Sequence, residues 1–165
     1  MRPLTSEEIR KSFVNCTKSE VRSMVLPNEF DRTKWDELDF LGWRDGKAPN
    51  RGYVVLERDD TVLGIGLAAN VSSRSRLKKN MCAFCVTTQD LASISLFAAR
   101  RAGTPGRQGN TVGTYACADL RCCGYVAGTA SPSVPQPHET LTTEERAVRM
   151  MTNLGRFVDK VLGTA

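Results

Sequence analysis

Two pairs of cysteines have the residue type and spacing of a metal site. Cys82 and Cys85 form a C-x2-C pair within MCAFC, and Cys117 and Cys122 form a second pair further along the chain. Zinc takes four ligands at tetrahedral corners, and a C-x2-C turn places two thiolates on one side of the ion. The two pairs together therefore predict one zinc ion, held by Cys82, Cys85, Cys117 and Cys122.

A site of four cysteines leaves no open coordination position, which is the pattern of structural rather than catalytic zinc. One alternative is a set of ordinary buried cysteines, but these seldom cluster in spaced pairs. Another is a redox C-x2-C motif, which would need a βαβ context that the sequence does not show. We therefore expect zinc binding to act as folding energy, on the order of 10 kcal/mol in small zinc peptides.

The identity of the fourth ligand is ambiguous, because Cys122 and Cys123 are adjacent. Successive side chains of a helix are turned by about 100°, so only one of the two can reach the ion. We favour Cys122 and keep Cys123 as the alternative. Cys16 lies far from both pairs along the chain, and we expect it to be a packing residue.

Residue patterns typical of catalysis are not found. His138 is the only histidine, and it stands in a proline-rich segment where we expect a solvent-exposed loop. No GxSxG, HExxH or P-loop pattern occurs. Cys123 could be a reactive thiol beside a metal site, but it has no evident base partner. We therefore expect a protein without enzymatic activity.

The composition is that of an ordinary globular chain. Its 165 residues, 41% hydrophobic and 25% charged, suit one domain with short terminal additions. No stretch approaches the about 20 apolar residues of a membrane span, and the first residues carry acids where a signal peptide needs an apolar run. We expect a cytoplasmic protein, in which reduced cysteines are available as metal ligands.

The net charge of +5 fits an acidic protein partner or a weak contact with RNA. Basic residues concentrate in a loop over 70–80 and in a turn over 100–110. The plain interpretation of such runs is a solvated surface. If the chain instead binds RNA or the ribosome, we expect phosphate contacts from Arg74, Arg76, Lys78, Lys79, Arg100, Arg101 and Arg107.

The N-terminal half is predicted to contain short helices, an aromatic segment and a β-hairpin. Capping residues and acids in the first turn predict helices over 4–14 and 17–25. The aromatic run 35–43 is expected to pack as a plug against a sheet. Alternating apolar residues then predict a hairpin with strands 53–58 and 62–68, joined by Arg58-Asp59-Asp60.

The C-terminal half is predicted to position the zinc ligands. After the C-x2-C knuckle we expect strands over 93–99 and 111–116, separated by a glycine-rich turn, and then a short helix opening at Cys117. Knuckle, hairpin and ligand-bearing helix in that order are the treble-clef arrangement. A proline-rich connector over 129–138 precedes a final helix over 140–162, whose apolar stripe is Val148, Met151, Leu154, Phe157 and Val161.

These elements predict an α+β fold with a treble-clef zinc core, β-hairpins, a C-terminal helix and short N-terminal helices. We place the short helical segment at 1–34 and the zinc domain at 35–165.

Several segments resemble one known family, running from about Phe40 to Leu162. They are FLGWRDGKAPNRGYVVLERDDTVLGIGL, MCAFC, SISLF, GTYACADLRC and RFVDKVL. The family is that of the elongation-factor-G-binding proteins, or FBP domain, which includes the fusidic-acid-resistance proteins of staphylococci. The resemblance covers the family's C-terminal treble-clef zinc domain. Staphylococcal members carry an extra N-terminal helical bundle, and the residues before Phe40 leave room for only one or two of its helices.

The resemblance implies a protein that docks on elongation factor G and affects its release from the ribosome, with an activity like that of the resistance proteins as a further implication. It also implies a partner-binding face at Met81, Val112, Tyr115 and Phe157, although plain core packing is the alternative for Met81, Tyr115 and Phe157. Val112 takes a position that is basic in the resistance proteins. The family's second cysteine pair is one residue more widely spaced than Cys117–Cys122, which points to Cys123 as the fourth ligand.

Overall fold

The computed structural model describes residues 1–69 and 78–164, and its core is an antiparallel sheet of five strands in the order β1-β2-β3-β6-β7. These strands are β1 (Phe40–Arg44), β2 (Arg51–Arg58), β3 (Thr61–Ala69), β6 (Ile94–Arg100) and β7 (Thr111–Cys117). A separate two-stranded sheet pairs β4 (Lys79–Met81) with β5 (Thr88–Asp90). The helices are α1 (Ser6–Lys11), α2 (Lys18–Ser23), α3 (Gly103–Arg107), α4 (Cys122–Ala127) and α5 (Thr143–Leu162), with 3-10 turns η1 (Phe30–Arg32) and η2 (Trp35–Glu37).

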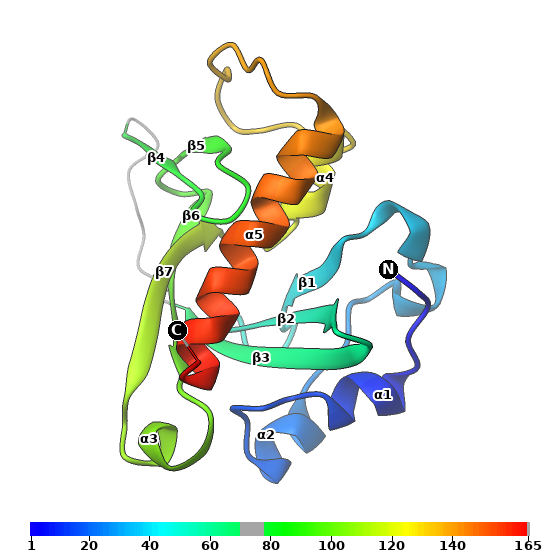
Figure 1. Cartoon of the computed structure of the whole chain (residues 1–165), viewed down its shortest axis with the longest axis vertical. Coiled ribbons are helices and arrows are strands. Elements are labelled where there is room, and N and C mark those ends of the chain that lie inside the picture. The colour runs from blue at the N-terminus through cyan, green and yellow to red at the C-terminus, as the bar shows by residue number, and fades with distance from the viewer. Residues whose placement is uncertain (70–77, 165) are drawn as a thin grey trace.

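The sheet is covered on both faces, which gives the fold three layers (Figure 1). Strand β2 shows this directly, because its successive side chains point to opposite faces. Val54 and Leu56 belong to the cluster that contains α5 and the four paired cysteines, whereas Tyr53 and Val55 belong to the cluster built with the N-terminal segment. The zinc elements and the N-terminal helices therefore lie on opposite sides of one sheet.

Two hairpins, β2–β3 and β6–β7, make up the sheet together with the edge strand β1, and the two hairpins meet only at a corner. Strand β2 pairs with β3 over its whole length, and β6 pairs with β7 in the same way, but β3 pairs with β6 only through Ala68 and Ala69. Figure 1 shows the β6–β7 hairpin crossing the β2–β3 hairpin. Asp59 and Asp60, in the predicted turn, have φ of 49° and 60°, as the favoured two-residue hairpin turn requires.

The N-terminal helices are confirmed but are shorter than predicted. Thr5 and Thr17 each cap a helix by a complete capping box, with Glu8 and Glu20 as the returning side chains. Helix α1 ends at Lys11 because the next residues bridge to β3, where Val14 N–H donates to Gly64 O at 3.0 Å. The N-terminal segment thus packs directly on the sheet.

The segment over 35–43 is not simply a plug. Trp35 lies in η2, but Phe40–Arg44 forms β1, an edge strand of the sheet. Trp43 is buried on the N-terminal side, and its Nε1–H donates to Val25 O at 2.9 Å. The aromatic run is therefore divided, because strand pairing with β2 takes its second half.

The final helix is confirmed, with one error in the predicted stripe. Helix α5 begins after the capping residue Thr142, and its buried residues are Met150, Leu154, Phe157, Val158 and Val161. Val148 is 67% exposed, so it does not belong to the core face. No helix within the described ranges is both long enough and apolar enough to cross a membrane.

Candidate metal centre

The four cysteines of the two predicted pairs meet in one buried cluster. The Sγ atoms of Cys82 and Cys122 are 3.7 Å apart, as are those of Cys85 and Cys117. All four Sγ atoms lie within 4.8 Å of one another. A tetrahedral zinc ion with Zn–S bonds of about 2.3 Å requires sulfur atoms about 3.8 Å apart. The spacing of the sulfurs therefore fits zinc.

The first pair lies in the knuckle between β4 and β5. Val86 N–H donates to Cys82 O at 2.9 Å, and Cys82 N–H donates to Thr87 O at 3.0 Å, which closes the turn around the ligands. Val86 has a φ of 62°, a left-handed conformation that is strained for a β-branched residue. A valine does not favour this conformation, so the turn at Val86 could not be predicted from the sequence.

The second pair comes from the end of one strand and the start of one helix. Cys117 is the last residue of β7, and Cys122 is the first residue of α4. Between them Leu120 has a φ of 60°, and its N–H donates to Cys117 O at 2.9 Å. The prediction that the helix opens at Cys117 is wrong, because this tight turn separates the strand from the helix.

Without a cation, the cluster cannot hold all four sulfurs as thiolates. Hydrogen bonding from Cys117 and its neighbours lowers the pKa of Cys85, whereas hydrogen bonding with Cys117 and burial raise the pKa of Cys122. Four thiolates cannot share a dry site without a compensating charge. A divalent zinc ion supplies that charge and holds all four sulfurs deprotonated.

Cys123 does not reach the cluster, so Cys122 is the fourth sulfur. The Cys123 side chain turns to β1, where its thiol donates to Phe40 O at 3.3 Å. Burial raises the pKa of the Cys123 thiol, which makes it a poor nucleophile. The alternative in which Cys123 is the fourth ligand, as the wider spacing in the family suggested, is therefore wrong. Cys16 packs beside Gly66, and burial raises its pKa to about 11.

A comparison with protein families matches residues 8–161 to the family described as FBP C-terminal treble-clef zinc-finger. The chain belongs to this family. Comparisons with curated proteins and with solved structures gave no match. The family match and the buried four-cysteine cluster together support one structural zinc ion. The match begins inside α1, so the FBP region includes the N-terminal helices. The resemblance seen in the sequence began only at Phe40.

The zinc turn of this FBP domain packs closely on the zinc-side face of the edge strand β1. Leu120 is buried against Gly42 of β1, and a Cβ added at Gly42 would lie 2.4 Å from Leu120 O. Because the obstacle is backbone held by the metal turn, it has little freedom to move. A glycine is therefore required where the zinc turn meets β1.

Gly42→Ala is expected to destabilise the FBP domain by about 1–3 kcal/mol, because the new methyl overpacks this contact. Gly155→Ala is the matched control, since a Cβ there meets nothing within 4 Å in the middle of α5. The control is expected to gain about 0.5–1 kcal/mol from helix propensity. Urea unfolding of the zinc-loaded proteins measures both, and equal stability of the two variants would contradict the packing argument.

The residues implied as a partner-binding face have different environments. Met81 and Tyr115 are 47% and 42% exposed, and Ala83 N–H donates to Tyr115 O at 2.7 Å, so the knuckle lies against this part of β7. Val112 is half-buried against the core. Phe157 is only 6% exposed, with its ring 5.5 Å from that of Phe84. The expectation that Phe157 joins an exposed face is wrong, because Phe84 of the knuckle covers it.

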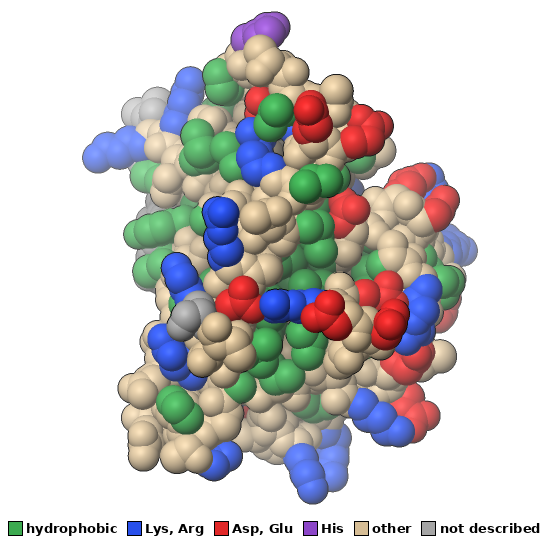
Figure 2. Space-filling view, in the orientation of Figure 1, with side chains coloured by type: hydrophobic (Ala, Val, Ile, Leu, Met, Phe, Trp, Pro, Cys, Tyr) green, Lys and Arg blue, Asp and Glu red, His purple; other side chains and the backbone are tan. Residues whose placement is uncertain are grey.

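The basic residues predicted to contact RNA are not gathered in one place among the residues described. Arg74 and Arg76 lie outside the described residues. Lys78 and Lys79 are exposed at β4, while Arg101 and Arg107 lie near α3, at the other end of the β6–β7 hairpin (Figure 1). Arg100 forms an ion pair with Glu20. Figure 2 shows Lys and Arg side chains dispersed over one face, with acidic side chains among them.

Proposed function

We propose that this FBP protein is a non-enzymatic, cytoplasmic binding protein that docks on elongation factor G and affects its release from the ribosome. The observation that carries the proposal is the pair of exposed apolar side chains, Met81 and Tyr115, beside the zinc centre of an FBP-family fold. The zinc holds the scaffold behind this pair, and takes no part in chemistry because four cysteines fill its coordination sphere.

The metal positions both side chains through the backbone. Met81 directly precedes the ligand Cys82, and Tyr115 stands two residues before the ligand Cys117 on β7. Exposed thioether and aromatic groups on a rigid frame are typical anchors of protein interfaces. Lys78 and Lys79 are exposed nearby in sequence, and they would complement an acidic surface on the partner.

Tyr115→Ala and Met81→Ala are each expected to weaken binding to purified elongation factor G by ~1–3 kcal/mol, as loss of an interface anchor does. Titration calorimetry measures the affinity, and metal analysis checks that each variant keeps one zinc. Val148→Ala is the control, because it removes a comparably exposed apolar side chain from α5 and is expected to leave affinity unchanged. Full affinity in both test variants would refute the assignment of this face.

A ribosome- or RNA-binding module is the second candidate, favoured by the exposed Lys78 and Lys79, which precede Met81 with only Asn80 between. The two candidates differ in salt dependence. Binding through phosphate contacts weakens steeply with salt, because condensed counterions are released. The affinity for elongation factor G through Met81 and Tyr115 is expected to change little between low and physiological salt. A steep fall in the logarithm of affinity with the logarithm of salt concentration, together with affinity for ribosomal RNA, would favour the second candidate.

A further inference from the structure

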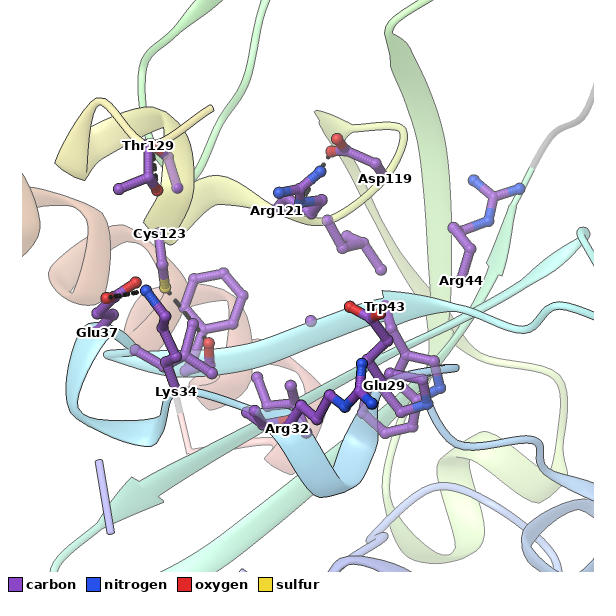
Figure 3. A pocket seen from close by; sticks show the side chains of 18 residues that line it. Glu29, Arg32, Lys34, Glu37, Trp43, Arg44, Asp119, Arg121, Cys123 and Thr129 are labelled. Carbon is purple, nitrogen blue, oxygen red and sulfur yellow. Dashed lines mark hydrogen bonds and ion pairs between the residues drawn. The ribbon is translucent and has the colours of Figure 1, made fainter. Parts of the chain in front are cut away.

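A groove runs along the free edge of β1, on the side of the molecule where the zinc turn meets the 3-10 turns (Figure 3). Its volume is about 400 Å³, within the usual range of ligand sites. One wall comes from the two ends of α4, with Asp119 and Arg121 before the helix and Thr129 after it. The opposite wall comes from η1, η2 and their flanks, and the floor is β1 itself, where Leu41, Gly42, Trp43 and Arg44 line the groove.

The floor presents backbone hydrogen-bonding groups that have no partner strand. Asp45 N–H donates to Arg51 O across the hairpin that joins β1 and β2. Hydrogen-bonded positions alternate along an antiparallel pair, so Trp43 and Leu41 also turn their backbone groups toward β2. The groups of Phe40, Gly42 and Arg44 therefore point toward the free edge.

Only the Phe40 end of this edge is covered. Phe40 O accepts the thiol of Cys123, but within residues 1–69 and 78–164 no hydrogen bond satisfies the outward groups of Gly42 and Arg44. The Arg44 side chain does not block them, because its guanidinium bonds to Ala118 O and lies over the Phe97 ring. Gly42 has no side chain at all. An unpaired edge of this kind is a template for another strand.

The walls of the groove favour an acidic occupant. Glu37 is already paired with Lys34 at 2.9 Å. Asp119 is likewise used within the chain, where it accepts hydrogen bonds from the Tyr125 hydroxyl at 2.8 Å and from Arg121 N–H at 3.1 Å. Arg32 and Arg121 are exposed, and neither forms an ion pair among residues 1–69 and 78–164. Glu29 also lines the groove, and it is likewise exposed and outside any of these ion pairs (Figure 3). The groove lining thus contains four basic and three acidic side chains, which leaves one positive charge in excess beside the unpaired strand.

We propose that this groove binds an extended, acidic peptide segment of a partner protein, which pairs with Gly42 and Arg44 as an added strand beside β1 and places carboxylates near Arg32 and Arg121. Main-chain hydrogen bonds supply affinity and the flanking arginines supply selectivity, as in other strand-addition sites. The proposal goes beyond the binding of elongation factor G through Met81 and Tyr115, because neither residue lines the groove.

The test uses the zinc-loaded full chain and a capped peptide of alternating glutamate and valine. Fluorescence anisotropy is expected to show saturable binding, and amide hydrogen exchange by NMR is expected to slow at Gly42 and Arg44 by about tenfold or more. The amides of Leu41 and Trp43, which already face β2, are expected to be unchanged and serve as internal controls. The same peptide with every internal amide N-methylated keeps its charge but cannot form the ladder, so it is expected not to bind.

Charge reversal tests the arginines separately from the backbone. Arg32→Glu and Arg121→Glu are each expected to weaken peptide binding by about tenfold, while Arg156→Glu on α5, an exposed arginine outside the groove, is expected to leave it unchanged. Absence of peptide binding at millimolar concentration would overturn the proposal. So would binding without protection of Gly42 and Arg44, or equal binding of the N-methylated peptide. Affinity for elongation factor G is measured in parallel and is expected to be unaffected by these charge reversals.

Discussion

Cys122→Ser is expected to abolish zinc binding and to unfold the FBP domain, whereas Cys123→Ser keeps both the metal and the fold. Cys122 contributes one of four clustered sulfurs and opens α4. A three-sulfur site loses much of a binding energy that is on the order of 10 kcal/mol in zinc peptides. Since a whole domain is stable by only about 5–15 kcal/mol, this loss is enough to unfold it.

The neighbouring variant is a matched control, because both cysteines are buried in the same helical turn. In Cys123→Ser the new hydroxyl can still donate to Phe40 O, so a cost of about 1 kcal/mol is expected. Metal analysis should give one zinc per chain for the wild type and Cys123→Ser and none for Cys122→Ser. Far-ultraviolet circular dichroism reports the fold, and a strong chelator should reproduce the Cys122→Ser spectrum. Zinc retained by Cys122→Ser and lost from Cys123→Ser would reverse the ligand assignment.

Phe157→Ala is expected to lower the free energy of unfolding by about 3–5 kcal/mol, the usual cost of removing a buried phenylalanine ring. The ring is nearly fully buried and contacts Phe84, which stands between the ligands Cys82 and Cys85. The cavity would therefore open directly behind the zinc knuckle. Loss of this support is also expected to weaken zinc retention against a competing chelator.

Val148→Ala is the control on the same helix, because its side chain is exposed and a surface truncation changes stability by less than about 0.5 kcal/mol. Urea unfolding in excess zinc separates the packing loss from metal loss. A Phe157→Ala variant of full stability that has lost affinity for elongation factor G would contradict the structure, since it would place the ring in the interface. Reduced affinity with reduced stability is the result that a buried ring predicts.

Local chemistry was readable where neighbouring residues determine the structure. Thr5 with Glu8, and Thr17 with Glu20, satisfy the backbone donors of a helix start within one turn, so these helices could be placed from the sequence. The Asp59-Asp60 turn was readable for a similar reason, because two residues able to adopt positive φ join two alternating strands. The ligand pairs and their order around a hairpin likewise predicted the treble clef and its zinc.

The sequence did not reveal the features that depend on contacts between distant segments. Val86 and Leu120 adopt positive φ in the two zinc turns although neither residue type favours it. Metal coordination and burial hold these two turns in place. Both effects require that the two cysteine pairs have already come together in the fold. The burial of Phe157 and the exposure of Val148 depend in the same way on where the knuckle and the sheet meet α5.

The sequence by itself thus determined the family, the metal and the order of elements, because cysteine spacing, caps and strand alternation are local properties of the chain. Tertiary structure alone decided which of two adjacent cysteines faces the ion, because a turn of about 100° per residue directs one to the cluster and the other to Phe40 O. It also decided that β1 is an edge strand whose Gly42 and Arg44 lack a neighbour. Strand order is set by pairing between segments far apart in sequence, and no local pattern encodes which strand is left at the edge.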